Sequence, residues 1–197
     1  MPAHPLYTEA MDRFSRRFAD VQQTDMKEPS AMTLSTVDAA GHPSSRIVLL
    51  RGIDERGFVF YTNSHSRKAR QMAEQTHVAL GWYWYVFDEQ VRVEGTVSKI
   101  DDETSDAYWA TRPRLSQIGA WASDQSEVLA DRETLEQRIQ SYETKFADQP
   151  VPRPPHWHGY RVAPQRLEFW EGRDARLHVR WIYEQQHDSW IKHLLYP

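Results

Sequence analysis

Cysteine is absent from the 197 residues of this chain. Without a thiol the protein forms no disulfide, holds no cysteine-ligated iron–sulfur cluster and uses no cysteine nucleophile. The absence fits a reducing compartment, and we expect a cytoplasmic protein. The sequence also lacks an apolar run long enough to cross a bilayer, so it predicts no membrane-spanning segment.

Two phosphate-binding signatures and an excess of positive charge are missing as well. The sequence contains neither GxGxxG nor GxxxxGK[ST], which argues against the usual dinucleotide and P-loop sites. The formal net charge of -4 argues against a nucleic-acid partner but allows a local basic pocket. Aromatic residues, in contrast, are abundant: 8 Trp, 9 Tyr and 7 Phe suit β-structure or stacking on ring-shaped ligands.

The hydrophobic pattern predicts many short strands and few helices. Helices are expected at 6–22, from Ser66 to about Gln75, around Tyr108 with Asp101 or Asp102 as cap, and at 127–146. Strands are expected at 31–37, 45–52, 58–62, 77–85, 90–100, 159–163, 166–171 and 177–184, with 189–195 as a further candidate. This order predicts a mostly β protein, an antiparallel barrel or sandwich with peripheral helices. We expect one domain over 1–197, with the helical segment 1–25 packed on it.

Positive side chains gather near the C-terminus. In a strand, Arg176, His178 and Arg180 would share one face, with Leu177 and Val179 on the other. Three potential cations in a row repel one another unless they are solvated or face an anion. In an aromatic-rich chain, this row indicates a site for a planar, phosphorylated ligand.

A second pair of cations, Arg67 and Lys68, follows Ser66 at the predicted start of a helix. Cations there lose about 0.3–1 kcal/mol each against the helix dipole, whereas a bound phosphate would reverse that cost. Two solvated side chains explain the pattern about equally well. Arg46 and Arg51 bracket Ile47–Leu50, a run typical of a strand buried on both faces, and by parity they point opposite ways. On the residues alone, two charges that mark where the strand leaves the core are the favoured explanation.

Three hydrogen-bonding side chains surround Pro113. Tyr108 and Arg112 are four residues apart on a predicted helix end, and Ser116 follows in a predicted loop. Together they suit a phosphate clamp, although an ordinary exposed helix end is somewhat favoured on chemistry alone. Gln125 and Ser126 could bind the polar edge of a ring. The sequence His156-Trp157-His158 is read as structural rather than metal-binding, because no acidic residue stands at ligand spacing.

From about Ala31 to Pro197 the chain resembles the pyridoxamine 5′-phosphate oxidase family. The matching strings, in order, are Arg46-Ile47-Val48-Leu49-Leu50, Phe60-Tyr61-Thr62-Asn63, Ser66-Arg67-Lys68-Ala69, Gln90-Val91-Arg92-Val93, the run from Arg112 to Trp121, Gln125-Ser126, Glu168-Phe169-Trp170 and Arg176-Leu177-His178-Val179-Arg180. Each string is weak alone, but eight in register are specific.

The resemblance implies a split β-barrel of the FMN-binding type and a homodimer with FMN at its interface. The residues that resemble FMN contacts are Arg46, Ile47, Val48, Leu49, Leu50, Arg51, Tyr61, Thr62, Arg67, Lys68, Gln90, Gln125, Ser126, Trp170 and Arg180. Those that resemble substrate contacts are Arg51, Tyr108, Arg112, Ser116, Arg176 and His178, with Arg176 and His178 as the catalytic pair.

The implied activity is that of an FMN-dependent oxidase. It would convert pyridoxamine or pyridoxine 5′-phosphate and O2 to pyridoxal 5′-phosphate and hydrogen peroxide, with ammonia released from the amine. Hydride would pass from C4′ of the substrate to N5 of the flavin, and no metal is implied. Two alternatives stay open: a flavin oxidase of the same barrel class acting on another ring, such as a phenazine precursor, and a non-catalytic binder of FMN or pyridoxal phosphate.

The chain departs from the family pattern at several positions. Arg51 stands where the family usually has Lys, and Val179 where it usually has Asp. Trp157-His158-Gly159 replaces a common Trp-Gly-Gly, and the chain ends in Leu194-Leu195-Tyr196-Pro197 rather than Arg-Leu-x-Pro. Arg51 keeps the positive charge but is planar and bulkier than Lys.

Overall fold

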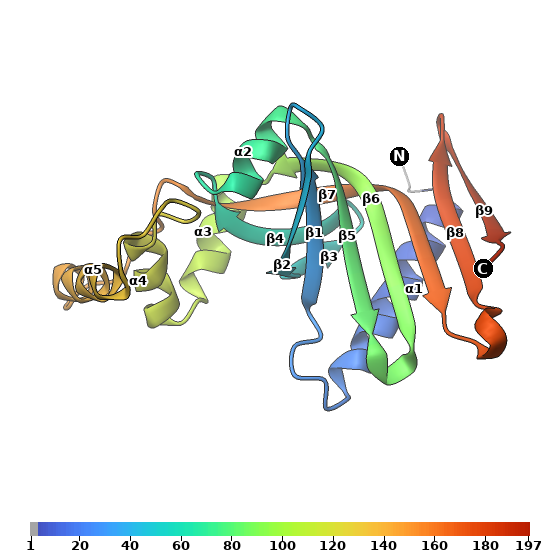
Figure 1. Ribbon diagram of the computed structural model, residues 1–197, viewed down its shortest axis with the longest axis horizontal. Coiled ribbons are helices and arrows are strands. Elements are labelled where there is room, and N and C mark those ends of the chain that lie inside the picture. Colours follow the sequence, from blue (N-terminus) through green and yellow to red (C-terminus); the bar gives the residue numbers. More distant parts are fainter. Residues whose placement is uncertain (1–3) are drawn as a thin grey trace.

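The computed structural model describes residues 4–197, and a curled antiparallel sheet forms most of it (Figure 1). The strands are β1 (Ala31–Val37), β2 (Pro43–Leu49), β3 (Gly52–Asp54), β4 (Gly57–Asn63), β5 (His77–Trp84), β6 (Glu89–Lys99), β7 (Trp157–Glu171), β8 (Val179–Gln186) and β9 (Ser189–Leu195). The helices are α1 (Pro5–Gln22), α2 (Arg67–Glu74), α3 (Asp102–Ala110), α4 (Arg114–Ala122) and α5 (Arg132–Lys145), with 3₁₀ turns η1 (Tyr85–Phe87) and η2 (Asp174–Arg176).

The strand order is β2-β1-β5-β6-β7-β4-β3, and β8 and β9 extend the sheet beyond the far part of β7. β7 is one continuous strand where two strands, 159–163 and 166–171, were predicted. The predicted break between them was wrong. The first part of β7 pairs with β4 and its last part with β8, while β6 lies along its other edge. Pro164, which lacks an N–H, sits at the register shift opposite Gly95, and the strand bends there without ending.

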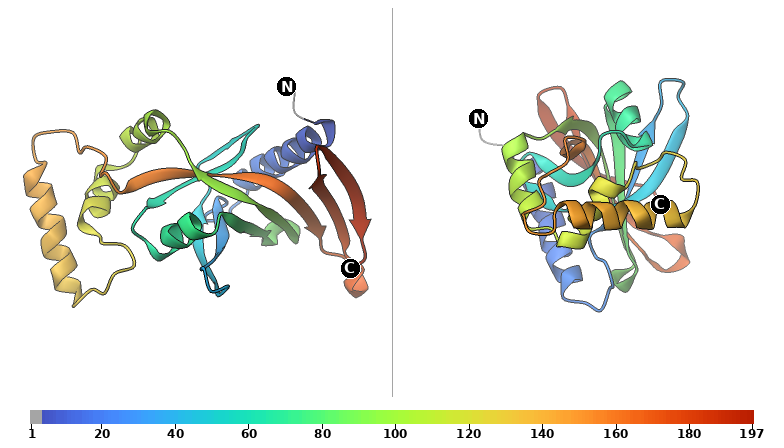
Figure 2. Two further views of the ribbon diagram at one scale, coloured as in Figure 1. Left: turned by 90° about the horizontal axis from the view of Figure 1, so that it is seen from above. Right: turned by 90° about the vertical axis from the view of Figure 1, so that its left-hand side faces the viewer.

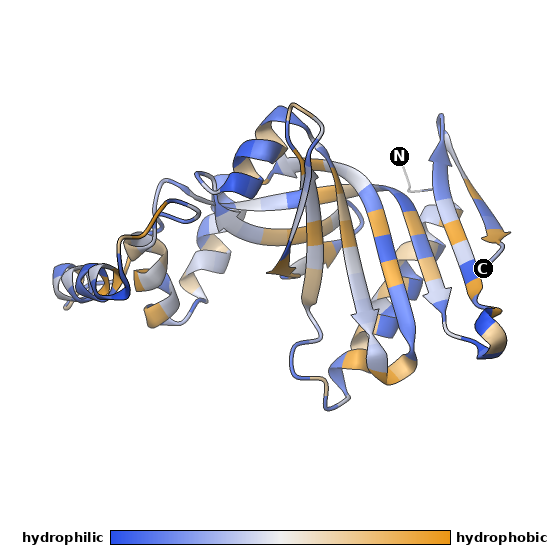
Figure 3. Ribbon diagram, in the orientation of Figure 1, coloured by the Kyte–Doolittle hydropathy of each residue, from blue (hydrophilic) through white to orange (hydrophobic). Residues whose placement is uncertain are grey.

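α1 confirms the predicted N-terminal helix and packs on the sheet. Its Phe14 is fully buried, with its ring centroid 4.8 Å from that of Phe58 and 4.9 Å from that of Trp82. The sheet supplies the matching apolar face, since buried residues alternate with exposed ones along β6 (Figure 3). Aromatic packing of this kind contributes about 0.5–1.5 kcal/mol per pair beyond area burial.

β2 contradicts the prediction of a strand buried on both faces. In residues 4–197 it pairs with β1 alone, and Ile47 is 62% exposed. The apolar run Ile47–Leu49 therefore presents part of its surface to the outside of this chain, and only Leu50, just after the strand, is buried. The predicted strand also ends earlier than expected, at Leu49.

A second, smaller hydrophobic cluster lies at the opposite end from β8 and β9. Its buried members are Trp109, Ile118, Phe146, Val151 and Trp157. α4 and α5 occupy that end of the molecule, as both directions of view agree (Figures 1 and 2). α5 starts at Arg132 rather than 127, because the side chain of Asp131 caps it by accepting from the Thr134 N–H. The assignment of 1–197 to one domain stays a prediction.

Among the helices of residues 4–197, none combines the length and hydropathy needed to cross a membrane.

Candidate active site

A pocket of about 230 Å³ opens between β2, β4, α2 and α3. Its lining consists of residues that the sequence had already singled out: Ile47, Val48, Leu49, Arg51, Tyr61, Thr62, Lys68, Tyr108, Arg112 and Gln125. A neighbouring pocket of about 320 Å³ shares Tyr61, Thr62, Arg112 and Gln125 and adds Ser116. We call the two together the basic pocket. The fold thus gathers predicted cofactor and substrate residues from five separate segments.

Lys68 lies in the basic pocket with only neutral partners. Its Nζ donates to Gln125 Oε1 at 2.8 Å, to Thr62 Oγ1 at 3.1 Å and to Ser66 Oγ at 3.2 Å. Burial lowers the pKa of Lys68 to about 8, and the positive charge of Arg46 adds to this effect. A buried ammonium that lacks a counter-ion is held at a cost, which an anionic ligand would remove.

Arg46 is fixed by hydroxyl and carbonyl groups rather than by a carboxylate. It donates to Thr36 Oγ1 and Ser44 Oγ, both at 2.7 Å, and to the Leu34 carbonyl oxygen at 3.1 Å. Burial lowers the pKa of Arg46, and the charge of Arg67 lowers it further. The buried Gln71 of α2 accepts from Thr36 and Ser44, so α2 and the β1–β2 edge are joined through one polar network.

Sequence reasoning missed Gln71. The only signal was its place on α2, one helical turn after Lys68, on the face that carries the buried residues of that helix.

Stacked aromatic rings form one wall of the basic pocket. The rings of Tyr61 and Tyr108 are 4.1 Å apart and nearly parallel, and Trp157 continues the stack at 4.9 Å from Tyr61. The guanidinium of Arg112 lies 4.9 Å from the Trp157 ring. No role at the site was predicted for Trp157, although the sequence His156-Trp157-His158 was noted as a structural segment.

Arg112 lies beyond α3, because that helix ends at Ala110, and Pro113 caps the next helix. The prediction that Ser116 lies in a loop was wrong: it belongs to the first turn of α4. Arg112 donates to the backbone oxygen of Ser116 at 3.2 Å, while its buried Nε has no hydrogen-bond partner among residues 4–197. Burial lowers the pKa of Arg112, which Tyr108 raises and Arg51 lowers. An unpaired buried donor points to a missing acceptor.

None of the basic pocket's cations makes an ion pair within residues 4–197. Most other arginines of the described chain do, as Arg70 does with Glu127 and Arg161 with Asp54. The lining cations without a carboxylate partner are Arg51, Lys68 and Arg112. Arg46 and Arg67, which adjoin the lining residues Ile47 and Lys68 in the chain, also lack such a partner within residues 4–197. The pocket is therefore built for an anion that the chain does not itself supply.

The C-terminal row of cations does not form as predicted. Arg176 belongs to η2 with a φ of 60°, and β8 begins only at Val179, so Arg176, His178 and Arg180 do not share one strand face. Val179 pairs with Glu171 in the ladder. The positive φ values at Ala175 and Arg176 turn the chain sharply, a feature that strand parity cannot predict.

A second cluster of predicted residues forms instead across β6, β7 and β8. Gln90 pairs with Trp170, and Trp170 pairs with Arg180, so the three lie in one row of the sheet. The ring centroid of His178 lies 4.4 Å from that of Trp170. We call this group, together with Arg176, the C-terminal cluster.

Glu168 is a buried carboxylate that forms an ion pair with Arg180 of the C-terminal cluster. Its carboxylate is 3% exposed, accepts from Arg180 Nε at 2.8 Å, and also pairs with Arg92. Burial would raise the pKa of Glu168, but the hydrogen bonds from the two arginines lower it below the usual range. No role was predicted for Glu168, although it stands in the matching string Glu168-Phe169-Trp170.

Within one chain the basic pocket and the C-terminal cluster are far apart. α3 and α4 lie toward one end of the molecule, and η2 and β8 lie at the other (Figures 1 and 2). Ser126, an exposed residue with a φ of 77°, does not line either pocket. A single copy therefore leaves the predicted site residues in two groups.

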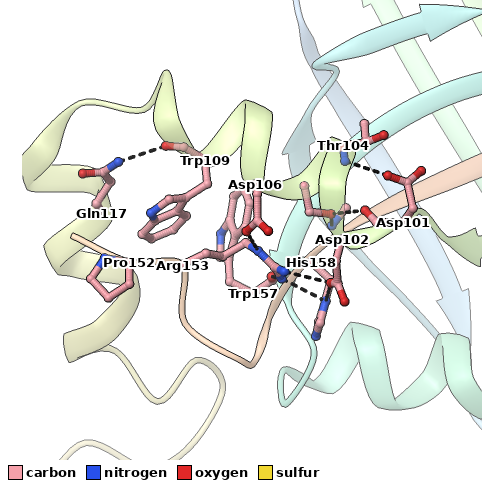
Figure 4. A network of polar contacts seen from close by, with 12 residues as sticks. Asp101, Asp102, Thr104, Asp106, Trp109, Gln117, Pro152, Arg153, Trp157 and His158 are labelled. Atoms are coloured by element: carbon pink, nitrogen blue, oxygen red, sulfur yellow. Dashed lines mark hydrogen bonds and ion pairs between the residues drawn. The ribbon is translucent and has the colours of Figure 1, made fainter. Parts of the chain in front are cut away.

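The histidines beside Trp157 do not form a metal site. Within residues 4–197 there is no group of three or more His, Asp or Glu side chains able to hold a metal ion. His156 Nε2 lies 3.1 Å from the Ala120 carbonyl oxygen. His158 Nδ1 lies 3.4 Å from Arg153 NH1, as Figure 4 shows. Burial lowers the pKa of His158, with Lys99 and Arg153 adding to the effect. The structural role of these residues stays a prediction.

The curled sheet and its pocket of stacked rings and unpaired cations define a split-barrel protein with an anion site. Family models agree: "Pyridoxamine 5'-phosphate oxidase" matches residues 18–146, and "Pyridoxine 5'-phosphate oxidase C-terminal dimerisation region" matches residues 157–197. The chain belongs to the pyridoxamine 5′-phosphate oxidase family.

Individual relatives support the same assignment. The pyridoxine/pyridoxamine 5′-phosphate oxidase of Acaryochloris marina is 50% identical over 185 residues, which cover 94% of this chain and 84% of that protein. The protein of the same name from Alkalilimnicola ehrlichii is 48% identical over 194 residues, covering 98% and 99%.

Solved structures confirm the split-barrel fold. PhzG from Burkholderia lata, solved with tetrahydrophenazine-1-carboxylic acid, has a TM-score of 0.91 and 30% identity, and the match covers 100% of this chain and 98% of that one. A pyridoxamine 5′-phosphate oxidase-related, FMN-binding protein from Nostoc punctiforme has a TM-score of 0.75 and 19% identity, covering 94% and 96%.

Proposed function

We propose that this protein is an FMN-dependent oxidase that converts pyridoxamine or pyridoxine 5′-phosphate to pyridoxal 5′-phosphate. The observation that carries the proposal is the basic pocket, in which cations without carboxylate partners lie beside stacked aromatic rings. A phosphorylated, planar heterocycle matches both properties. Relatives about 50% identical bear the name of this activity.

The donor set of the basic pocket fits the phosphate of FMN. Lys68 and Arg46 have neutral partners only, and Arg67 adds a third positive charge near Arg46. Thr62 and Gln125 supply polar groups next to Lys68. These residues would hold the cofactor, together with Tyr61 and the segment Ile47–Arg51. Ser126, which lines neither pocket, stays a prediction from the resemblance.

We propose that the complete site needs a second copy of the chain. The C-terminal cluster holds the remaining predicted residues, Gln90, Trp170, Arg176, His178 and Arg180, at the far end from the basic pocket. The family model that matches residues 157–197 is described as a dimerisation region. In a homodimer of two-fold symmetry, each basic pocket would face the partner's C-terminal cluster, giving two equal sites.

Substrate binding would use the clamp of Tyr108, Arg112 and Ser116. Arg112 offers its unpaired Nε to the substrate phosphate, and Tyr108 offers a ring face and a hydroxyl. Binding energy from this non-reacting phosphate would fix the reacting carbon in place. Arg51, at the edge of the same pocket, would add positive charge.

Bound FMN would supply the two-electron acceptor that O2 regenerates, chemistry that no side chain of this protein provides. Arg176 and His178 would orient the amine or hydroxyl of the substrate and accept its proton. Histidine suits this task because its ordinary pKa of about 6.5 is near neutrality. Trp170 holds the His178 ring by direct contact, which fixes the direction of that base.

The experiment is an oxidation assay in air. Purified protein is expected to carry FMN and to convert pyridoxine 5′-phosphate to an aldehyde, with one hydrogen peroxide formed per aldehyde. Protein that retains FMN but consumes no oxygen with either B6 phosphate would overturn the proposal and favour a binding role.

The second candidate is oxidation of a phenazine precursor. PhzG from Burkholderia lata, at TM-score 0.91, favours it, although its 30% identity is below the 48–53% of the relatives named for B6 phosphates. Residues Arg112 and Ser116 support the B6 reading, since a phenazine carboxylic acid carries no phosphate to occupy them. A direct comparison of the catalytic efficiency for pyridoxine 5′-phosphate and for a reduced phenazine carboxylic acid decides between the two.

A further inference from the structure

Arg153 lies in the proline-rich segment 149–155, which joins α5 to β7 and which we call the connector. Its side chain is only 12% exposed, and its nitrogens face groups on two elements (Figure 4). On α3, Nε contacts Asp106 Oδ1 at 2.5 Å and NH2 contacts Asp102 Oδ1 at 2.8 Å. On β7, NH1 donates to the Trp157 carbonyl oxygen at 2.8 Å and lies 3.4 Å from His158 Nδ1.

Asp102 and Asp106 are one helical turn apart, so Arg153 forms ion pairs with two residues on the same face of α3. A planar guanidinium that binds two carboxylates fixes direction as well as distance. Surface ion pairs contribute little, but Arg153 is itself largely buried and donates to the backbone as well. These contacts join α3 to the connector and, through the Trp157 carbonyl oxygen, to the start of β7.

The connector is held in turn by indole donors from the helices it touches. Trp109 Nε1 donates to the Val151 carbonyl oxygen and Trp121 Nε1 to that of Pro152, both at 2.8 Å. Four prolines, at 150, 152, 154 and 155, restrict the backbone. A stiff segment tied in this way can transmit position between β7 and the helices α3 and α4.

Only one residue of the proposed substrate clamp lies on α3, and a second follows two residues after the helix ends. Tyr108 lies in the last turn of α3, and Arg112 follows the helix, with the N–H of Arg112 donating to the Trp109 carbonyl oxygen at 3.1 Å. Trp157, whose carbonyl Arg153 holds, forms the ring surface on which Arg112 lies. Arg153 therefore contacts both α3, which carries Tyr108, and Trp157, whose ring lies against Arg112.

We propose that Arg153 is a positioning residue that sets the affinity of the clamp for the phosphate of the substrate, through α3 and Trp157. The inference rests on the proposed function and extends it to a residue that contacts neither substrate nor cofactor. It is specific in direction: loss of Arg153 weakens binding of the substrate phosphate, leaves FMN bound, and leaves the chemical step nearly unchanged once substrate is bound.

The test compares Arg153→Met, Arg153→Lys and a control, Arg132→Met, with the wild-type holoenzyme. Arg132 makes an exposed ion pair with Glu136 on α5, so its loss removes one charge without touching α3. For Arg153→Met we expect KM for pyridoxine 5′-phosphate to rise about tenfold, with kcat within about twofold and FMN stoichiometry unchanged. Arg153→Lys restores part of the loss, because one ammonium can still reach a carboxylate. The control keeps the wild-type KM.

Hydrogen–deuterium exchange gives a second readout that does not require the activity. In Arg153→Met, amides of residues 105–112 are expected to exchange several-fold faster, while those of α2 keep their wild-type rates. If the wild type oxidises no B6 phosphate, the proposed function has failed, and this exchange pattern still decides whether Arg153 fixes α3.

Two results would overturn the inference. One is an unchanged KM together with unchanged exchange in residues 105–112. The other is a lowered kcat and a lowered FMN content that accompany the change in KM to the same extent in Arg153→Lys and Arg153→Met. That result would indicate general damage to the fold. Should Arg153→Met fail to fold, Asp106→Asn takes its place: its KM is expected to rise by a smaller factor, and a wild-type KM would contradict the proposal.

Discussion

Replacement of Lys68 by Met is expected to change how the stability of the FMN-free protein depends on pH. Met keeps an apolar stem of similar length but has no charge. In the folded protein, burial lowers the pKa of Lys68 from 10.5 to about 8. Between these two values the unfolded chain binds more protons at this position than the folded chain, so wild-type stability rises with pH there. The variant lacks this contribution.

The magnitude follows from the size of the shift. One pKa unit corresponds to about 1.4 kcal/mol, so a shift from 10.5 to about 8 corresponds to about 3.5 kcal/mol as an upper bound. Partial access of water to the pocket reduces this value. We expect the free energy of unfolding of the wild type, minus that of Lys68→Met, to increase by about 1–2.5 kcal/mol between about pH 7.5 and pH 10.

Urea unfolding of the FMN-free proteins at the two pH values measures this difference, because titrations elsewhere cancel between wild type and variant. Protein concentration is held constant, since a dimer is expected. A difference that stays the same within about 0.5 kcal/mol would refute the account of Lys68 as a buried, unpaired cation.

The lowered pKa of Lys68 is also expected to make cofactor binding depend on pH. An anion next to Lys68 favours its charged form, so wild-type affinity for FMN is expected to fall as pH rises above about 8. In Lys68→Met the affinity is lower at neutral pH and loses that part of the dependence. Fluorescence titration of FMN at a series of pH values measures it, and parallel curves for both proteins would contradict the assignment of Lys68 to the phosphate.

Three further substitutions test other parts of the structure. Arg176→Met is expected to lower kcat about 100-fold while FMN stays bound, which stopped-flow reduction of the flavin can measure; an unchanged rate would remove Arg176 from the site. Glu168→Gln leaves two arginines without their buried carboxylate and is expected to cost about 2 kcal/mol of unfolding free energy, and a loss under 0.5 kcal/mol would contradict this. Gly57→Ala places a Cβ 2.0 Å from the Val162 carbonyl oxygen at a φ of 124° and is expected to cost over about 2 kcal/mol. Gly41→Ala, also at positive φ but with open space, is the matched control, and equal losses would show that the contact is unimportant.

Much of the fold could be predicted from hydrophobic spacing. The helix at 6–22, the strands at 31–37 and 58–62 and the pair at 77–85 and 90–100 all correspond to observed elements. What spacing could not predict was long-range pairing. β7 continues through Pro164 because β6 shifts register opposite it, and an apolar run that looked buried became the exposed part of edge strand β2.

In the candidate site, too, some features could be predicted from the sequence and others could not. The resemblance of eight strings in register to the pyridoxamine 5′-phosphate oxidase family selected the residues of the basic pocket. The chemistry of each string alone did not select them. Their partners were not predictable, because Gln71, Glu168 and Arg153 act through contacts with residues 27 to 76 positions away. Strand parity failed at Arg176, where two consecutive positive φ values replace the expected strand.

Subunit mixing tests the central claim, that one chain's basic pocket and its partner's C-terminal cluster form the site. Arg112→Met and Arg176→Met are each expected to be nearly inactive as homodimers. After unfolding and refolding of an equal mixture, half of the dimers combine one chain of each kind and hold one intact site, so about a quarter of wild-type activity should return. Activity no higher than that of the separate variants, with mixed dimers present, would contradict a site shared between two chains.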